Sequence, residues 1–216
     1  NNINTNNTTT LITILYYKMS TNEVVRISKT LSYLLRHGAV KEHLNINKEG
    51  FIKVDDVLAH KQLRGVTIDQ LQHVVKTNDK NRFHLETLPD GLLYIRANQG
   101  HTIKQVDDVE FKTITSIDDV PSVIHGTYRK HLISIKSKGL NRMDRNHIHF
   151  ATGDHGDVVS GMRSNCELVI IIDLQLALDD GIPFYLSKNG VVLCPGIKTV
   201  NGEGYLPPKY FKSITD

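Results

Sequence analysis

The chain has 216 residues, 39% of them hydrophobic and 23% charged, and a formal net charge of +3. This length and composition predict a globular protein with a buried core. They exclude a disulfide scaffold, because Cys166 and Cys194 are the only cysteines, and they favour an intracellular protein of the cytoplasm or nucleus. The longest apolar stretch, "ELVIIIDLQLAL", is interrupted by Asp173 and is too short to cross a bilayer. We therefore expect no membrane anchor.

Charge is distributed unevenly along the chain. Residues 22–100 contain 12 Lys and Arg against 9 Asp and Glu, residues 101–120 contain 2 against 5, and residues 121–216 contain 11 against 9. Two mildly basic blocks that flank an acidic segment are compatible with a polyanionic ligand. An imbalance of this size more often only keeps a protein in solution, so charge alone does not identify the ligand.

The first 19 residues are predicted to form a disordered tail. "NNINTNNTTT" is a low-complexity tract that buries too little apolar area to compensate for ordering. The "LITILYY" that follows lacks the basic start and the small-residue cleavage site of a secretory signal. Met19 is the first methionine, and the sequence leaves open both the translation start and the purpose of the tail.

Residues 20–100 are predicted to form three helices and a hairpin. Ser20 and Glu23 have capping-box spacing, and apolar residues then recur with helical period up to Gly38. Further helices are predicted over residues 54–63 and 67–78, and the second of these begins with another capping-box pair.

After residue 78 the spacing of apolar residues changes from the helical period to the alternation of a strand. "RFHLETLPDGLLYIRAN" alternates and turns at Pro89-Asp90-Gly91, which predicts a hairpin. Three short helices followed by a β-ribbon resemble a winged helix.

Residues 101–120 are predicted to be an acidic linker, and residues 121–216 a second, strand-rich unit. Its expected strands are "SVIHGTY", "HIHFAT", "CELVIIIDL" and "PFYLSKNGVVLC". A helix over residues 129–139 ends at Gly139, as expected of a C-cap. The fold class is therefore α+β, in two lobes.

Arg36 and His37 stand side by side at the end of the first predicted helix. The simplest interpretation is that cations in the last turn complement the helix dipole and that Gly38 stops the helix. A functional interpretation needs further arginines, because a dianionic phosphate is best bound by several guanidinium groups that each offer parallel N–H donors. Arg82, Arg142 and Arg145 are candidates, although Arg82 is equally well explained as a solvated residue of a strand.

Histidines suggest two other kinds of site. In "VIHGTY", His125, Gly126 and Thr127 offer a side-chain hydrogen-bonding group, room for close backbone approach and a hydroxyl, which suit a ribose or a pyrophosphate. His147 and His149 share one face of a strand, but with His155 they lack an acidic or thiolate partner at convincing spacing. We therefore expect no metal.

Five segments, in this order and at these separations, resemble the NAD-dependent RNA 2′-phosphotransferases: "ISKTLSYLLRHGA", "GFIKVDDVLAH", "NDKNRFHL", "IHGTYRKHLISIKSKGLNRMDRNHIHFA" and "GIPFYLSKNGVVLCPG". The resemblance extends from about Val24 to Phe211. It implies a winged-helix-like amino-terminal lobe that binds RNA and phosphate, and a carboxy-terminal lobe with an ADP-ribosyltransferase-like fold that binds NAD.

The resemblance also implies the site residues. The family's catalytic tetrad corresponds here to Arg36, His37, Arg82 and Arg145. The NAD-binding positions correspond to His125, Gly126, Thr127 and His149, with Arg163 and Ser164 as further candidates for contacts to the adenosine diphosphate. Many ADP-ribosyltransferases carry a glutamate near the last core strands, whereas "NGVVLCPG" is apolar. A phosphate nucleophile is already anionic and needs no such base.

The activity implied is transfer of an internal 2′-phosphate from RNA, such as spliced tRNA, to NAD, which is consumed. The products are RNA with a 2′-hydroxyl, nicotinamide and ADP-ribose 1″,2″-cyclic phosphate. The reaction passes through an intermediate in which the RNA phosphate is ADP-ribosylated. The enzyme is expected to be a monomer. Two alternatives stay open at this point. One is a winged-helix nucleic-acid-binding protein with a non-catalytic NAD-sensing lobe, and the other is an enzyme that ADP-ribosylates nucleic-acid phosphates without the second step.

Overall fold

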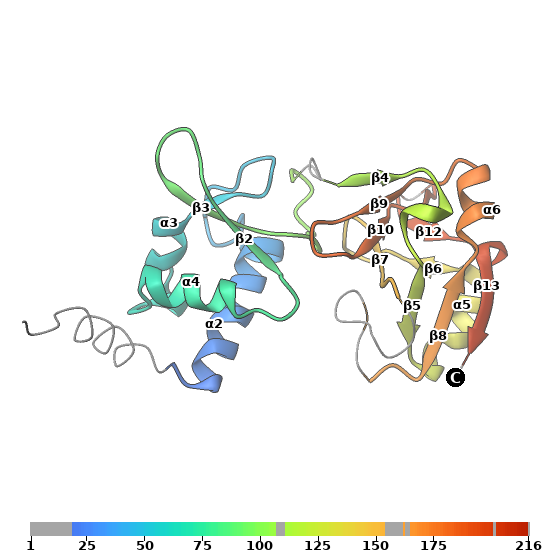
Figure 1. Ribbon diagram of the computed structural model, residues 1–216, viewed down its shortest axis with the longest axis horizontal. Helices are drawn as coiled ribbons and strands as arrows, with labels where there is room; N and C mark the ends of the chain where they lie inside the picture. Colours follow the sequence, from blue (N-terminus) through green and yellow to red (C-terminus); the bar gives the residue numbers. More distant parts are fainter. Residues whose placement is uncertain (1–18, 107–110, 154–161, 163–164, 201, 216) are drawn as a thin grey trace, which may run out of the picture.

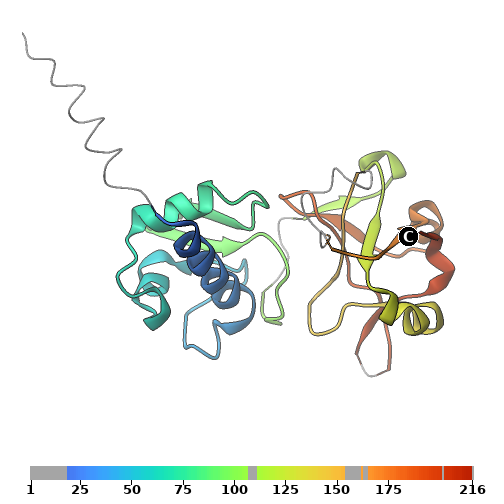
Figure 2. The ribbon, with the colours of Figure 1, turned by 90° about the horizontal axis from the view of Figure 1, so that it is seen from below.

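The structure is a computed structural model that describes residues 19–106, 111–153, 162, 165–200 and 202–215. It is a mixed α and β protein of short helices and small antiparallel sheets. Figures 1 and 2 show the elements in two groups that lie side by side along the long axis of the molecule. Within the described residues, no helix is long and apolar enough to cross a membrane. The predicted tail lies outside them except for Met19, which packs against the first core.

The first group contains all of the helices predicted for the amino-terminal part. Its helical elements are α2 (Thr21–Tyr33), the π-helical turn η1 (Leu34–Gly38), α3 (Val54–Ala59), the 3₁₀ turn η2 (Lys61–Leu63) and α4 (Ile68–Lys76). The Ser20 hydroxyl accepts from the backbone N–H of Glu23, and Thr67 forms a reciprocal capping box with Gln70, so both predicted helix starts are confirmed. The helix predicted over residues 54–63 is interrupted at His60, whose backbone is extended.

The predicted hairpin is confirmed, and it belongs to a three-stranded sheet. Strands β1 (Ile52–Lys53), β2 (Phe83–Thr87) and β3 (Leu93–Ala97) pair antiparallel in the order β1-β3-β2. Strand β1 was not predicted, because two residues carry no periodicity. Apolar side chains from the helices and this sheet form the first core, which includes Ile27, Leu31, Leu35, Leu71 and Ile95.

The helical run of α2 and η1 ends at Gly38, as predicted, but Gly38 is not among the glycines with positive φ. The backbone of Ala39, which follows, is also helical. Glycine is required because of packing: a Cβ at Gly38 would lie 2.6 Å from Cζ of Tyr33. The predicted position of the helix end is therefore confirmed, whereas the reason for glycine there is packing against Tyr33 and not a left-handed backbone.

The second group consists mainly of sheets. Its strands are β4 (Lys112–Ile114), β5 (Ile124–Thr127), β6 (Leu140–Asn141), β7 (Ile148–Phe150), β8 (Leu168–Ile172), β9 (Phe184–Leu186), β10 (Val192–Cys194), β11 (Ile197–Lys198), β12 (Gly204–Leu206) and β13 (Phe211–Thr215). They form three sheets with the orders β4-β9-β10-β7, β11-β12-β6 and β13-β8-β5. The helical elements are η3 (Ile117–Asp119), η4 (Arg129–His131), α5 (Leu132–Lys138), α6 (Leu174–Asp179) and η5 (Pro208–Tyr210).

A second core lies between these sheets and the short helices, and it includes Phe150, Ile170, Phe184, Val192 and Tyr210. The strands expected from residues 122–194 are all present, and Gly139 ends α5 with φ of +93°. Strand β7 has the predicted alternation, because Ile148 and Phe150 lie in this core. The missed strands β11 and β12, of two and three residues, are too short to show a pattern, whereas the missed β13 has five residues.

The segment predicted as an acidic linker contributes to both cores. Ile103 and Val106 are buried in the first core, and Ile114 and Val120 in the second. Residues 107–110 lie outside the described part. The predicted linker therefore contributes buried side chains to the first core before residue 107 and to the second core from β4 onward.

Candidate functional site

Arg36 lies in the π-helical turn at the end of α2. Its side chain is half-buried, and Nε and Nη2 are inaccessible to solvent with no hydrogen-bond partner among the described residues. Burial, followed by the positive charges of Arg145 and Arg82, lowers the pKa of Arg36 to about 10. A guanidinium with unused donors, held next to two other cations, is arranged to receive an anion.

His37 follows Arg36 on the exposed side of the same turn. Its Nδ1 lies 3.1 Å from Oγ1 of Thr102. Its pKa is lowered by burial and then by the positive charges of Arg36 and Arg145. The imidazole is therefore neutral at pH 7 and has one nitrogen available to accept a hydrogen bond.

Arg82 lies just before β2, in the connection that follows α4. The Asn78 carboxamide oxygen accepts from the Arg82 backbone N–H at 3.0 Å and from its Nη1 at 3.2 Å. The Asp79 carboxylate lies 3.7 Å from the same Nη1. Asn78 therefore orients the guanidinium while leaving other donors of Arg82 for a ligand.

Arg142 and Arg145 lie together in the turn between β6 and β7, and they do different things. Arg142 donates from Nη1 to the Arg145 carbonyl and from Nη2 to the Gly202 carbonyl, both at 2.6 Å. Its guanidinium therefore braces the turn. Arg145 is exposed and acts electrostatically on Arg36, His37 and His149.

The predicted histidines lie on adjoining strands. His149, in β7, is 8% exposed, and its Nε2 has no partner among the described residues. Burial, followed by the charge of Arg145, holds the pKa of His149 well below its usual range. His125, in β5, donates from Nδ1 to the His149 carbonyl at 2.9 Å, so the two strand positions are adjacent.

Gly126 and Thr127 complete β5. Thr127 is buried. A Cβ at Gly126 would lie 2.3 Å from Cγ of Met162 and 2.9 Å from Sγ of Cys166. In this structure, therefore, the space beside Gly126 that a Cβ would fill is occupied by the side chains of Met162 and Cys166.

The structure thus brings together Arg36, His37, Arg82, Arg145 and His149, which come from both groups of elements. Arg163, Ser164 and His155 lie outside the described residues. No cluster of three His, Cys, Asp or Glu side chains able to hold a metal ion occurs in the described part of the chain.

Sequence reasoning missed two residues of the connection after β3. His101 is 5% exposed, and neither ring nitrogen has a hydrogen-bond partner among the described residues. Burial lowers the pKa of His101 to about 4, with further contributions from Arg36 and Arg96. Thr102 contacts both Arg36 and His37. A lone histidine and a lone threonine in a connection carry no spacing signal, so only the fold reveals them.

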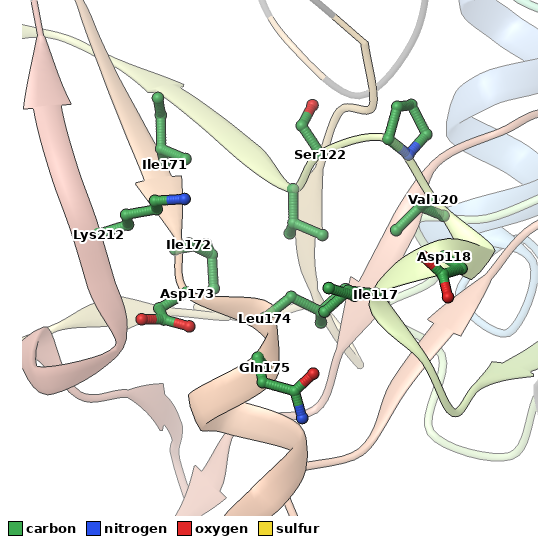
Figure 3. Close-up of a pocket in the computed structure, with 12 residues that line it drawn as sticks. Ile117, Asp118, Val120, Ser122, Ile171, Ile172, Asp173, Leu174, Gln175 and Lys212 are labelled. Atoms are coloured by element: carbon green, nitrogen blue, oxygen red, sulfur yellow. The ribbon is translucent and has the colours of Figure 1, made fainter.

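A cavity of about 690 Å³ lies elsewhere, between η3, the end of β8 and α6 (Figure 3). Lys212 is the one cation among its lining residues. Its Asp173 carboxylate accepts from the Leu176 N–H and caps α6, and the Ser122 hydroxyl donates to the Gly153 carbonyl. These polar groups serve the fold, so the cavity is not the candidate site.

The convergent guanidinium groups, with a histidine beside them, have the chemistry that suits a phosphate-bearing anion. Comparison with known families agrees, because residues 22–196 match the family described as RNA 2′-phosphotransferase, Tpt1 / KptA family. The chain belongs to this family, whose members are enzymes.

Several relatives cover most of the chain. A zebrafish (Danio rerio) protein named tRNA 2′-phosphotransferase 1 is 50% identical over 87% of this chain and 83% of its own length. The Saccharomyces cerevisiae tRNA 2′-phosphotransferase is 39% identical over 80% of this chain and 79% of its own length. A Rhodopirellula baltica protein named probable RNA 2′-phosphotransferase is 33% identical over 81% of this chain and 92% of its own length.

Proposed function

We propose that this protein removes an internal 2′-phosphate from RNA, with spliced tRNA as the substrate, and transfers it to NAD. The observation that carries the proposal is the buried Nε and Nη2 of Arg36, which have no hydrogen-bond partner in the described part of the chain and lie within the field of Arg82 and Arg145. An uncompensated guanidinium of this kind is costly unless an anion completes it. The names of the relatives supply the identity of that anion, a 2′-phosphate on tRNA.

The residues that we propose to hold NAD are His125, Gly126, Thr127 and His149, with Arg163 and Ser164. The unpaired buried Nε2 of His149 fits a ligand that offers a hydrogen-bonding partner, since buried polar atoms are normally satisfied. When bound, NAD would supply the ribose carbon that the 2′-phosphate attacks, with nicotinamide as leaving group, and the neighbouring hydroxyl that finally accepts the phosphoryl group.

The arginines would act mainly through charge. Arg36, Arg82 and Arg145 would bind the phosphoryl oxygens and stabilise the negative charge that develops on them during transfer. His37, neutral and hydrogen-bonded to Thr102, would accept the proton of the attacking ribose hydroxyl. The phosphate nucleophile itself needs no base.

We also propose that the two groups of elements correspond to two functional lobes. Residues 20–100 would be a winged-helix-like lobe that binds RNA, and residues 121–216 an ADP-ribosyltransferase-like lobe that binds NAD, with the substrates meeting between them. The two separate cores and the helix–hairpin order of the first group support this division. One chain supplies all the proposed groups, so it would act as a monomer.

The test incubates the protein with an RNA that bears one internal 2′-phosphate, with and without NAD. We expect NAD-dependent release of nicotinamide, RNA with a free 2′-hydroxyl, and ADP-ribose 1″,2″-cyclic phosphate. RNA binding without NAD consumption would instead establish a nucleic-acid-binding sensor. Nicotinamide release with ADP-ribose left on the RNA would establish a transferase that lacks the second step.

A further inference from the structure

Thr102 occupies a position that ties the connection after β3 to the end of the first helix. Its backbone N–H donates to the Arg36 carbonyl at 2.9 Å. Its side-chain hydroxyl lies 3.3 Å from the same carbonyl and 3.1 Å from Nδ1 of His37. One hydroxyl therefore lies between a backbone acceptor and a ring nitrogen.

The hydrogen count of this arrangement determines the direction of each bond. A hydroxyl has one hydrogen to donate and two lone pairs to accept with, whereas a carbonyl oxygen only accepts. When the hydroxyl donates to the Arg36 carbonyl, it faces His37 with a lone pair. His37 then donates from Nδ1–H, and in a neutral ring Nε2 is left as the acceptor.

From this geometry we propose that Thr102 is a positioning residue that holds His37 in the tautomer with Nδ1 protonated and the Nε2 lone pair directed to the reactants. Its kinetic consequence rests on the function proposed above, in which His37 accepts a proton from a ribose hydroxyl. In the other tautomer, Nε2 carries the proton and the ring has no lone pair to offer there. Thr102 would thus act on the reaction only through His37.

The surroundings of His37 support a neutral ring. Arg36 and Arg145 both disfavour a second proton on it, and His101 is a further titratable neighbour. A neutral imidazole has two tautomers, and the hydrogen bond made by one nitrogen decides which is populated. Among the described residues, the bond to Thr102 is the side-chain hydrogen bond that the His37 ring makes.

The first arm of the test measures the tautomer directly and needs no substrate. In the full chain labelled with ¹⁵N-histidine, at pH 8, we expect the His37 resonances to show a protonated Nδ1 and an unprotonated Nε2. Thr102→Val keeps the shape but removes the hydroxyl and should shift His37 toward the Nε2-protonated form. Thr102→Ser should restore the wild-type pattern. An Nε2-protonated His37 in the wild type, or an unchanged pattern in Thr102→Val, would overturn the proposal.

The second arm measures turnover of the 2′-phosphorylated RNA with NAD. Thr102→Val should lower kcat by roughly ten- to a hundredfold with KM nearly unchanged, because a misplaced proton removes part of the acid–base contribution. Thr102→Ser should retain most of the activity. The matched control is Thr30→Val, which removes another hydroxyl-to-carbonyl bond from α2 at a distance from His37.

The two arms separate the two proposals. Wild-type protein with no 2′-phosphate transfer would refute the proposed function and leave the tautomer result standing. Loss of turnover in Thr102→Val with an unchanged His37 tautomer would refute the positioning role while the proposed function stood.

Discussion

Arg36 is held in an environment that opposes its charge. Two of its nitrogens have no partner among the residues that the structure describes. Burial, followed by repulsion from Arg145 and Arg82, lowers its pKa to about 10. Such an arrangement destabilises the folded protein by itself, which agrees with the ligand-binding role that we propose for Arg36. A buried charge without a compensating partner is typical of residues that serve binding rather than folding.

Replacing Arg36 should therefore separate stability from activity. We expect Arg36→Met to raise the free energy of unfolding by about 1 kcal/mol, because an uncompensated buried charge is removed while most of the side-chain volume stays. Turnover of 2′-phosphorylated RNA should fall at least about a hundredfold. Urea unfolding and kcat on the same preparations provide the measurement. The exposed Arg64→Met serves as control, and a destabilised Arg36→Met would contradict this view.

Arg82 provides the complementary case, since its guanidinium is oriented by Asn78 and partly exposed. Arg82→Ala should leave the unfolding midpoint nearly unchanged and lower kcat about a hundredfold or more, because one positioned charge on the transferred phosphoryl group is lost. Arg64→Ala, at another exposed arginine of the same group, should match the wild type in both assays. Full activity of a folded Arg82→Ala protein would exclude the role proposed for Arg82.

At the scale of elements, the π-helical turn η1 is what presents Arg36 and His37. Such turns are rare in proteins, and those that occur are often found at functional sites. The Tyr33 ring packs on Gly38, and its hydroxyl donates to the Glu42 carboxylate at 3.0 Å, which in turn lies 3.2 Å from Nε2 of His60. These contacts of Tyr33, Glu42 and His60 thus hold the turn in shape.

Gly38→Ala tests this packing. A Cβ placed 2.6 Å from Tyr33 Cζ forces the ring away from Glu42, and overpacking of this kind typically costs about 1–3 kcal/mol. We expect a lower Tm together with reduced turnover, since Arg36 and His37 move with the turn. In the double variant Tyr33→Leu/Gly38→Ala, the loss of Tm should be smaller than the sum of the two single losses. Additive losses would show that the ring and the glycine are not coupled.

The connection after β3 is a second element that the site depends on. The Asn98 N–H donates to the Arg82 carbonyl at 2.9 Å, Thr102 bonds to Arg36, and the Asn146 N–H donates to the His101 carbonyl at 3.0 Å. Asn146 directly follows Arg145. Residues 98–102 therefore form backbone hydrogen bonds with Arg36, with Arg82 and with Asn146, the neighbour of Arg145.

At the scale of the whole molecule, two cores are joined by a contact region that contains two buried histidines, His101 and His149, and the half-buried His147. His101 and His147 each have a pKa lowered to about 4 by burial, followed by nearby arginines, and the pKa of His149 is lowered well below its usual range. Protonating any of them places a cation next to the arginines of the site. The folded state thus excludes protons that the unfolded chain accepts.

The sign of the pH dependence follows from this difference. Below pH 6.5 the unfolded chain binds protons at these histidines, whereas the folded chain does not until about pH 4. The free energy of unfolding should be highest above pH 6.5 and should fall as the pH decreases, by about 1.4 kcal/mol per pH unit for each histidine. Urea unfolding between pH 7.5 and 4.5 measures it.

His101→Leu should remove one histidine's share of that slope, and a substitution of the exposed His131 by Leu is the control. A stability that does not change over this pH interval would contradict the neutral state of the buried histidines.

The amino-acid sequence by itself determined the helix starts at Ser20 and Thr67, the hairpin of β2 and β3 and the alternation of β7, because these depend on local capping and periodicity. Its motifs also determined the family. Arg82 and Arg145 were separated from ordinary surface arginines only by resemblance, since one residue in a strand pattern has no distinguishing spacing.

Only the tertiary structure decided how these pieces act together. It placed Arg36, Arg82 and Arg145 in one electrostatic field, showed that Arg142 braces a turn, and gave Gly38 its reason in the Tyr33 ring. It also brought His101 and Thr102 to the site from a segment with no motif. These properties depend on burial and on contacts between residues far apart in the chain, and local sequence patterns do not encode such contacts.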